Sequence, residues 1–313
     1  MTTVTYYLIM SVVSVLRCLP LVWVARLGRK LGGLAYHLDK RHRKRALANL
    51  HKVFGDEWEP SKIVSTAKEN FRRLGENYAC AIRAAYMSDE ELSPHVEVKG
   101  AEHLVDPENP EQEQNRIFAI GHFGNFELYA RLGDLLDFKK PGTTYRALKN
   151  PAANRVMEEM RGRSRLTYFE RKRDVKFLKE SLREGGWSLG ILCDHHAGGG
   201  GIPSRCLGHL CSASPAPAVL SLRYRAKLYS AFVFRTSLAR WVIEVRPEIP
   251  LRNEEGPLGI KEITQKVQDV IGESVRQDPA NWFWVHNRWR TKGKAFARFN
   301  EEGGPEAGSK GGK

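Results

Sequence analysis

Residues 117–127 read IFAIGHFGNFE, and this stretch decides which fold the chain can adopt. The apolar run RIFAIGH (116–122) predicts a buried strand, which leads into a turn containing Gly124 and Asn125 and then into a helix expected over 125–137. Open α/β sheets place their ligand crevices at the carboxyl ends of strands, and His122 stands at such an end. The stretch therefore predicts an α/β fold with His122 at a crevice.

The pair His122 and Glu127 is the first candidate for catalysis. Glu127 follows about one helical turn after His122, so its carboxylate is expected to accept a hydrogen bond from one imidazole nitrogen. The other nitrogen would then be free to act as a general base. The nearby sequence offers no Ser or Cys as an obvious nucleophile, so the base would activate a hydroxyl of the substrate. A structural His–Glu pair would show the same spacing.

The rest of the chain predicts helices first and then a layered α/β arrangement. Residues 26–92 carry apolar side chains at three- and four-residue spacing and are expected to be helical. Further strands are expected at 95–100, 143–148, 187–194, 228–236 and 241–247, and further helices at 151–163, 174–185, 212–225 and 259–275. This alternation predicts N-terminal helices followed by a mixed sheet with helices packed on it.

Charge and the N-terminal segment indicate a membrane protein. The 313 residues carry 50 Lys and Arg against 36 Asp and Glu, a net charge of +14, which calls for an anionic partner such as a membrane, an acidic protein or a nucleic acid. Residues 4–24 are apolar and long enough to cross a bilayer, but Arg17 and Pro20 fit a helix lying in the interface equally well. A buried core helix is the remaining alternative.

The basic residues after this segment set the expected topology. They lie between Arg26 and Arg45 and favour the cytoplasmic side by the positive-inside rule. Five scattered cysteines fit a reducing compartment. We therefore expect an anchor helix (1–25), a basic helical region near the membrane (26–93), an α/β domain (94–299) and a disordered Gly-rich tail (300–313).

Five ordered segments resemble one known family. The segment GHFGNFELYA (121–130) resembles the His-x4-Asp/Glu box of the lysophospholipid acyltransferase superfamily. YRALKNPAANRVMEEMRGRSR, LGILCDHHAGGGGIPSRCLGHLCSASPAPAVL and DPANWFWVHNRWRTK follow it, and LGRKLGGLAYHLDKRHRKRALANLHKVFG precedes it. Together they are similar to the bacterial lipid A biosynthesis lauroyl/myristoyl acyltransferase family, over about residues 5–295. The resemblance implies a glycerol-phosphate-acyltransferase-like fold with a mixed, mostly parallel sheet flanked by helices.

The resemblance also implies an activity and its partners. A fatty acyl chain would pass from an acyl thioester, on acyl carrier protein or coenzyme A, to a hydroxyl of a glycolipid precursor, without a metal or bound cofactor. The reaction would take place at the cytoplasmic face of the inner membrane, in contact with membrane lipids. Another lipid acceptor, such as a lysophospholipid or an aminolipid, would require the same chemistry.

The family boxes suggest roles for individual residues. His122 would be the base and Glu127 its orienting partner. Arg161 and Arg163 would stabilise an oxyanion or bind an acceptor phosphate, unless they form a solvated helix face; Arg161 is expected to be the inward one. The residues expected to line the substrate site are Gly121, Gly124, Asn125, Asp194 and His195, of which the last two could instead brace the active loop. The loop that follows Asp194 is expected to flank the acyl groove and influence chain length.

Two other interpretations need different chemistry. His195, His196, Cys206, His209 and Cys211 invite a zinc site, although their spacing matches no standard zinc box. The basic charge and the aromatic segment WFWVHNRWR (282–290) also fit a nucleic-acid-binding protein. No recognition motif such as a helix-turn-helix is apparent, and we expect neither a metal nor a nucleic-acid partner.

Overall fold

The computed structural model describes residues 2–105 and 114–290 of the chain. The expected tail (300–313) and the end of the expected α/β domain (291–299) lie outside these residues.

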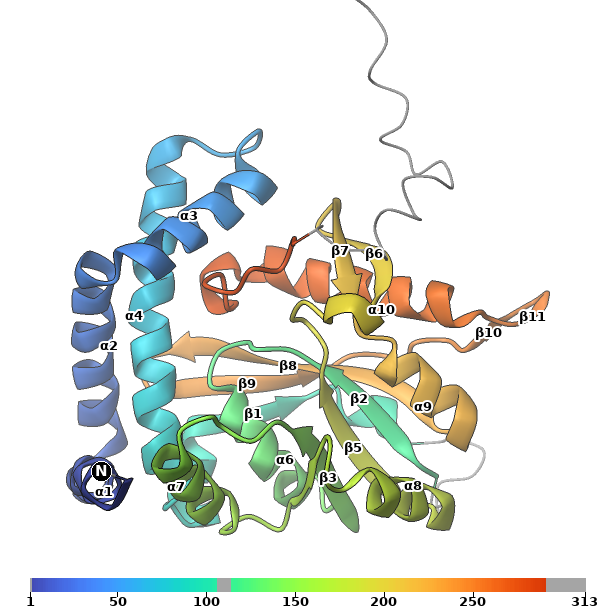
Figure 1. Ribbon diagram of the computed structural model, residues 1–313, viewed down its shortest axis with the longest axis horizontal. Coiled ribbons are helices and arrows are strands. Elements are labelled where there is room, and N and C mark those ends of the chain that lie inside the picture. The colour runs from blue at the N-terminus through green and yellow to red at the C-terminus, as the bar shows by residue number, and fades with distance from the viewer. Residues whose placement is uncertain (1, 106–113, 291–313) are drawn as a thin grey trace, which may run out of the picture.

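One seven-stranded sheet forms the centre of the protein, in the order β1-β9-β8-β2-β5-β3-β4 (Figure 1). Its strands are β1 (Val96–Lys99), β2 (Arg116–Ile120), β3 (Lys140–Tyr145), β4 (Thr167–Glu170), β5 (Trp187–Leu192), β8 (Lys227–Ser237) and β9 (Arg240–Val245). Strands β8, β2, β5, β3 and β4 run parallel, whereas β9 is antiparallel to β8 and parallel to β1. The predicted mixed, mostly parallel sheet is confirmed.

Side-chain alternation along the central strands gives the sheet two apolar faces. Ile117 and Ala119 point to the main core, which is shared with α8 (Val175–Glu184), α9 (Ala216–Tyr224) and α10 (Ile260–Gln277). Phe118 and Ile120 point to the opposite face. There, α6 (Tyr129–Leu135) covers part of the sheet and α7 (Pro151–Arg161) lies beside it (Figure 1).

The N-terminal third is helical, as predicted. It comprises α1 (Thr2–Cys18), α2 (Leu21–Leu38), α3 (Lys40–Phe54), α4 (Pro60–Ala84) and the short α5 (Asp89–Leu92). Helices α2 and α4 stand side by side at one end of the sheet, and α1 packs on α7 through Val13, Val156 and Met160 (Figure 1).

The expected single apolar helix is divided in two. The chain breaks between α1 and α2 at Pro20, whose ring removes a backbone donor. Among the helices of the described residues, none combines the length and the apolar character that a membrane crossing requires. The expectation of a transmembrane helix is therefore not supported.

Glycines bring α2 and α4 into direct backbone contact. A Cβ on Gly32 would lie 2.1 Å from the carbonyl oxygen of Phe71, and a Cβ on Gly75 would lie 2.1 Å from that of Gly28. Small residues at such a contact let two helices approach more closely than side chains would allow. The two helices therefore form one rigid unit.

A buried ion cluster ties this unit to the sheet. Glu76 of α4 is fully buried and accepts hydrogen bonds from Arg29 Nη1 (3.2 Å), Arg235 Nε (2.8 Å) and the backbone N–H of Ala239 (2.9 Å). The donors come from α2, from β8 and from the turn that follows β8. Burying a carboxylate is costly unless it is paired in this way. The cluster therefore fixes the helical unit against the sheet.

Three segments differ from their predictions. Strand β3 starts at Lys140 rather than 143, because its Pro141-Gly142 pair resembles a turn in sequence. The short strand β4 was not predicted. The helix expected over 212–225 begins only at Ala216, because residues up to Ala213 form a hairpin, β6 (Ile202–Cys206) and β7 (His209–Ala213).

Candidate active site

His122 lies at the carboxyl edge of the sheet, beside a carboxylate from the neighbouring strand. Ile120, the last residue of β2, pairs in register with Leu192, the last residue of β5, and His122 and Asp194 each follow two residues later. The imidazole Nδ1 of His122 lies 2.8 Å from Asp194 Oδ1, and the backbone N–H of His122 donates to Oδ2, also at 2.8 Å. The parallel register of two central strands thus builds the pair.

Asp194 is held as an anion. It is fully buried, and Trp282 Nε1 donates a third hydrogen bond to Oδ2 at 2.9 Å. Burial alone would raise the pKa of Asp194, but the nearby His122 and His195 and the hydrogen bonds from His122 hold this pKa well below its usual range. Because an ionised carboxylate can only accept, Nδ1 of His122 carries a proton, which leaves Nε2 as the nitrogen that can accept one from a substrate.

The structure gives Glu127 another partner than His122, with which a hydrogen bond was expected. Glu127 lies in a 3₁₀ turn, Phe126–Leu128, and pairs with Arg161, whose Nη2 and Nε donate to its two oxygens at 2.8 and 3.4 Å. His122 meets its partner across the sheet instead of along the chain. The segment therefore contributes one residue to each of two separate pairs, His122–Asp194 and Arg161–Glu127.

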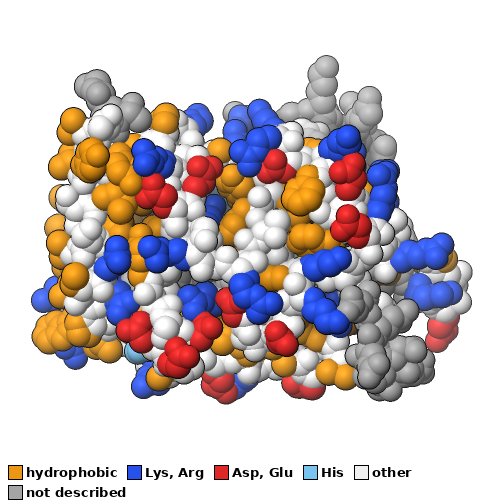
Figure 2. Space-filling model, turned by 90° about the horizontal axis from the view of Figure 1, so that it is seen from below, with side chains coloured by type: hydrophobic (Ala, Val, Ile, Leu, Met, Phe, Trp, Pro, Cys, Tyr) orange, Lys and Arg blue, Asp and Glu red, His pale blue; other side chains and the backbone are white. Residues whose placement is uncertain are grey.

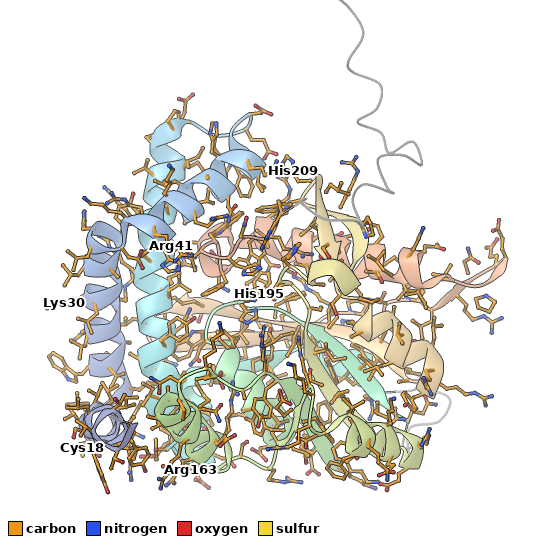
Figure 3. The ribbon with its side chains drawn as sticks, in the orientation of Figure 1. Cys18, Lys30, Arg41, Arg163, His195 and His209 are labelled. Carbon is orange, nitrogen blue, oxygen red and sulfur yellow. The ribbon has the colours of Figure 1, made fainter. Side chains whose placement is uncertain are left out.

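The two arginines of the family box are not equivalent. Arg161 ends α7, lines the central cavity and lies over the rings of Tyr145 and Tyr168 at 5.7 and 5.3 Å from their centroids. Arg163 is directed elsewhere, with its guanidinium 4.3 Å from the ring centroid of Tyr86. Figure 3 shows Arg163 at the edge of the molecule near α7, far from His195 above the centre of the sheet. Of the two, only Arg161 reaches the candidate site.

The backbone on either side of His122 is packed too tightly for residues larger than glycine. A Cβ on Gly121 would lie 2.8 Å from the Phe123 ring, and Gly124 has a φ of +49°, in the left-handed region that favours glycine. Asn125 is buried, and its amide has no hydrogen-bond partner among the described residues. It borders a small cavity of about 40 Å³ together with Glu127 and Arg161.

Three imidazole rings stack at the site. The ring centroids of His122 and His195 are 3.8 Å apart and those of His195 and His286 are 3.9 Å apart, with interplanar angles of 4° and 9°. Burial lowers the pKa of His195 to about 3 and that of His286 to about 4. Both rings are therefore neutral near pH 7, and His195 offers an uncharged face to the ring of His122.

The closing segment of the described chain completes the site. It contributes Trp282 to Asp194, His286 to the imidazole stack, and the fully buried Arg288, which donates to the carbonyl oxygens of His195 (3.0 Å) and Ser212 (2.6 Å). The sequence analysis used this segment for the family resemblance but predicted no site residue in it. Its His and Arg, which stand within a tryptophan-rich run, could have indicated these roles.

Helices near the N-terminus hold the closing segment in place. Asn70 of α4 donates to the carbonyl oxygens of Ala280 (2.9 Å) and Trp282 (2.6 Å). Asn49 of α3 donates to those of Trp284 (2.7 Å) and His286 (2.8 Å). Two buried amides thus replace the sheet or helix partners that these carbonyls lack.

The same residues are a poor fit to a metal ion. Ligand atoms of His122, Asp194 and His195 lie within 4.8 Å of one another. The two rings are stacked in parallel, however, so their nitrogen lone pairs, which lie in the ring planes, do not converge on one point. His196, Cys206, His209 and Cys211 of the zinc alternative do not belong to this group. Burial raises the pKa of Cys206 to about 12, which disfavours the thiolate that zinc binds.

A cavity of about 750 Å³ opens at His122, within the size range of ligand sites. Its polar part is lined by His122, Glu127, Arg161, His195 and His286. Its apolar lining residues fall into two groups, which we call the sheet arm and the helix arm after the elements that supply them. The sheet arm is lined by Phe118, Ile120, Phe138, Pro141, Gly190 and Leu192, and the helix arm by Ile9, Val13, Ile82, Val156, Met157 and Met160. The arrangement places the imidazole of His122 beside an extensive apolar lining.

Comparison with known proteins identifies the family of this chain. A family model described as bacterial lipid A biosynthesis acyltransferase matches residues 1–291. The chain is 24% identical over 297 residues to a lipid A biosynthesis acyltransferase of Haemophilus influenzae, covering 88% of this chain and 86% of that one. It is 26% identical over 298 residues to the lipid A biosynthesis lauroyltransferase of Escherichia coli (strain K12), covering 88% and 87%. The chain belongs to the bacterial lipid A biosynthesis acyltransferase family and is an acyltransferase.

Proposed function

We propose that the enzyme transfers a fatty acyl chain from an acyl thioester to a hydroxyl of a lipid A precursor, with His122 as general base and Asp194 as its positioning residue. The observation that carries the proposal is the His122–Asp194 pair at the mouth of a cavity with two apolar arms. The family match supports lipid A as the acceptor class, and acyl carrier protein or coenzyme A would carry the donor.

The proposed reaction follows from the proton positions at His122. Nε2 takes the proton of the acceptor hydroxyl as its oxygen attacks the thioester carbonyl, forming a tetrahedral oxyanion. Asp194 stabilises the resulting imidazolium through Nδ1–H. Collapse of the oxyanion breaks the carbon–sulfur bond, and the proton on Nε2 passes to the departing sulfur. The products are the ester and a free thiol.

A direct assay tests the function. The purified enzyme in detergent is given an acyl thioester and a lipid A precursor, and mass spectrometry detects the acylated product. We expect one acyl chain to be added per acceptor and one thiol to be released with it. A lysophospholipid acceptor and the two donor carriers, compared at equal concentration, identify the substrates. Product formed only with the lysophospholipid would move the proposal to the alternative lipid.

Arg161 is proposed to stabilise the oxyanion, with Glu127 as the residue that positions it. Glu127 binds Nε and Nη2, which leaves Nη1 without a hydrogen bond within the described part of the chain. We expect Arg161→Ala to lower kcat by about 10²–10³-fold with little change in KM. Arg161→Lys should restore only part of the lost kcat, since lysine cannot donate two hydrogen bonds to Glu127 as arginine does.

Arg163→Ala is the matched control and should retain wild-type kinetics, because Arg163 contacts Tyr86 instead of the cavity. A rise in KM without a fall in kcat for Arg161→Ala would show that this arginine binds the acceptor, through a phosphate for example. That result would contradict the oxyanion role.

We also propose that α1 and α2 bind the cytoplasmic face of the inner membrane by lying in its interface. Large apolar side chains are exposed along both helices: Val4, Tyr7, Leu8, Val12 and Val15 on α1, and Trp23, Leu27, Leu31, Leu34 and Leu38 on α2. In Figure 2 hydrophobic side chains gather along the side of the molecule where these helices lie. The exposed Arg26, Lys30 and Lys44 lie near them and would contact anionic headgroups.

Leu31→Glu tests this membrane surface. We expect its binding to anionic vesicles, measured by flotation, to fall about tenfold or more, because a charge replaces one apolar anchor. Lys176→Gln, on the exposed face of α8, changes the net charge by the same amount and should bind normally. Equal loss in both variants would mean that overall charge, rather than this apolar face, governs binding.

A further inference from the structure

The sheet arm of the cavity starts directly beneath the catalytic base. Ile120 and Leu192, which line it, stand two residues before His122 and Asp194 on paired strands. Any chain whose carbonyl lies at His122 can therefore continue down the face of the sheet between β2 and β5, the two central strands in Figure 1.

Gly133, Phe138 and Pro141 line the part of this arm that lies away from His122. Helix α6 packs on β3 so tightly that a Cβ on Gly133 would lie 2.6 Å from Pro141. The rings of Phe118 and Phe138 lie 5.7 Å apart beside them. The helix arm differs, because one of its walls is α1, whose other face is exposed, and because Tyr78 at its edge is half-exposed. The sheet arm, bordered by the sheet and α6, is therefore the arm whose depth can limit the length of a chain.

Gly190 forms the middle of the floor of the sheet arm. In β5, Leu189 and Ile191 point into the main core, so Gly190 faces the cavity, in register with Phe118 of β2 and Thr143 of β3. A Cβ at Gly190 would lie 3.1 Å from Ile120 Cδ1 and 3.6 Å from Thr143 Oγ1, and both residues line the cavity. Any side chain at position 190 would therefore take space from the arm.

The distance from His122 to Gly190 is comparable with the length of a fatty acyl chain. Gly190 pairs with Phe118, four residues before His122, which places it about 13 Å from His122 along the strand at about 3.3 Å per residue. We propose that the transferred acyl chain lies in the sheet arm and that Gly190, by lacking a side chain there, determines how long a chain the enzyme accepts. This proposal rests on the acyl transfer proposed above.

The proposal moves the expected control of chain length from a loop to the sheet. The sequence suggested the Gly-rich loop after Asp194, but a Cβ on Gly199 or Gly200 of that loop would meet nothing within 4 Å. Those glycines do not border the cavity, whereas Gly190 and Leu192 of β5 do.

Chain-length profiles test the proposal. The kcat/KM of wild type, Gly190→Ala and Gly190→Val is measured with saturated acyl thioesters of increasing length and one acceptor. We expect the optimum to move to shorter donors, further for valine than for alanine, with short-chain activity retained. Each methylene excluded from the arm should cost about fourfold, the equivalent of about 0.8 kcal/mol, so the ratio of long- to short-chain kcat/KM should fall about 10- to 60-fold for valine.

Two further variants make the result decisive. Phe138→Ala enlarges the part of the arm away from His122 and should move the optimum to longer donors, the opposite direction. Gly200→Val makes the same change as Gly190→Val in the loop and should leave the profile unchanged. Thermal unfolding identifies a variant that fails to fold, and if Gly190→Val does so, Gly190→Ala and Phe138→Ala carry the test.

The outcomes separate the two proposals. Absence of acyl transfer by the wild-type enzyme with every donor and acceptor would overturn the proposed function. Wild-type transfer with the same optimum in the Gly190 variants and in Phe138→Ala would overturn only the role of Gly190. A shift in Gly200→Val alone would return the control of chain length to the loop and overturn the proposal.

Discussion

Replacing Asp194 with asparagine is expected to lower kcat about 10³–10⁴-fold while the protein remains folded. Asparagine keeps the shape of the side chain, but it carries no charge to stabilise the imidazolium of His122 and permits the wrong tautomer of the ring. Steady-state kinetics with one donor and one acceptor measure the loss. Asp269→Asn, at an exposed position on α10, is the matched control and should be fully active.

A double variant shows whether the two residues act as a unit. His122→Ala should lose at least as much activity as Asp194→Asn, and the combined variant should lose little more than His122→Ala alone. Glu127→Gln should act with Arg161 instead, giving no further loss in an Arg161→Ala background. Near-normal kcat in Asp194→Asn would refute the assignment of Asp194 as the positioning carboxylate.

The adjacent glycines Gly32 and Gly33 are expected to respond to alanine in opposite directions. Gly32→Ala should lower the free energy of unfolding by about 2–3 kcal/mol, because its Cβ would lie 2.1 Å from the backbone oxygen of Phe71 and would force α2 away from α4. Gly33→Ala should raise it by about 0.5–1 kcal/mol, since its Cβ would meet only the Arg72 side chain, at 3.7 Å, and alanine favours the helix.

Urea unfolding followed by tryptophan fluorescence measures both effects under identical conditions. The pair controls itself, because the two substitutions are chemically identical and neighbouring in sequence. Equal stability of the two variants would show that α2 and α4 are not in backbone contact and do not form one rigid unit.

Local patterns in the sequence were sufficient to predict most of the architecture. The apolar runs that became β2, β5, β8 and β9 are long and buried, so their composition identifies them. β4 was missed because it has only four residues and is mostly half-buried, which leaves no clear pattern. The start of β3 was misplaced because Pro-Gly usually marks a turn, whereas here it lies within a strand.

The candidate site shows where sequence reasoning reaches its limit. His122 was found because its context is local: a strand, a glycine and a turn. Its partner was misassigned, because Glu127 is near in sequence whereas Asp194 is near only once β5 has paired with β2. Trp282 and His286 are separated from His122 by more of the chain still. Spacing predicts contacts along a helix or strand, but not which strands become neighbours.

The clamp formed by Asn49 and Asn70 has a consequence for the timing of activity during synthesis. Both asparagines leave the ribosome at least 210 residues before the backbone carbonyls that they bind, in residues 280–286. Until then Asp194 lacks its tryptophan donor and the imidazole stack lacks its outer ring. A nascent chain can therefore pair its strands before the hydrogen bonds around Asp194 are complete, so maturation of the candidate site waits for residues 280–286 to emerge.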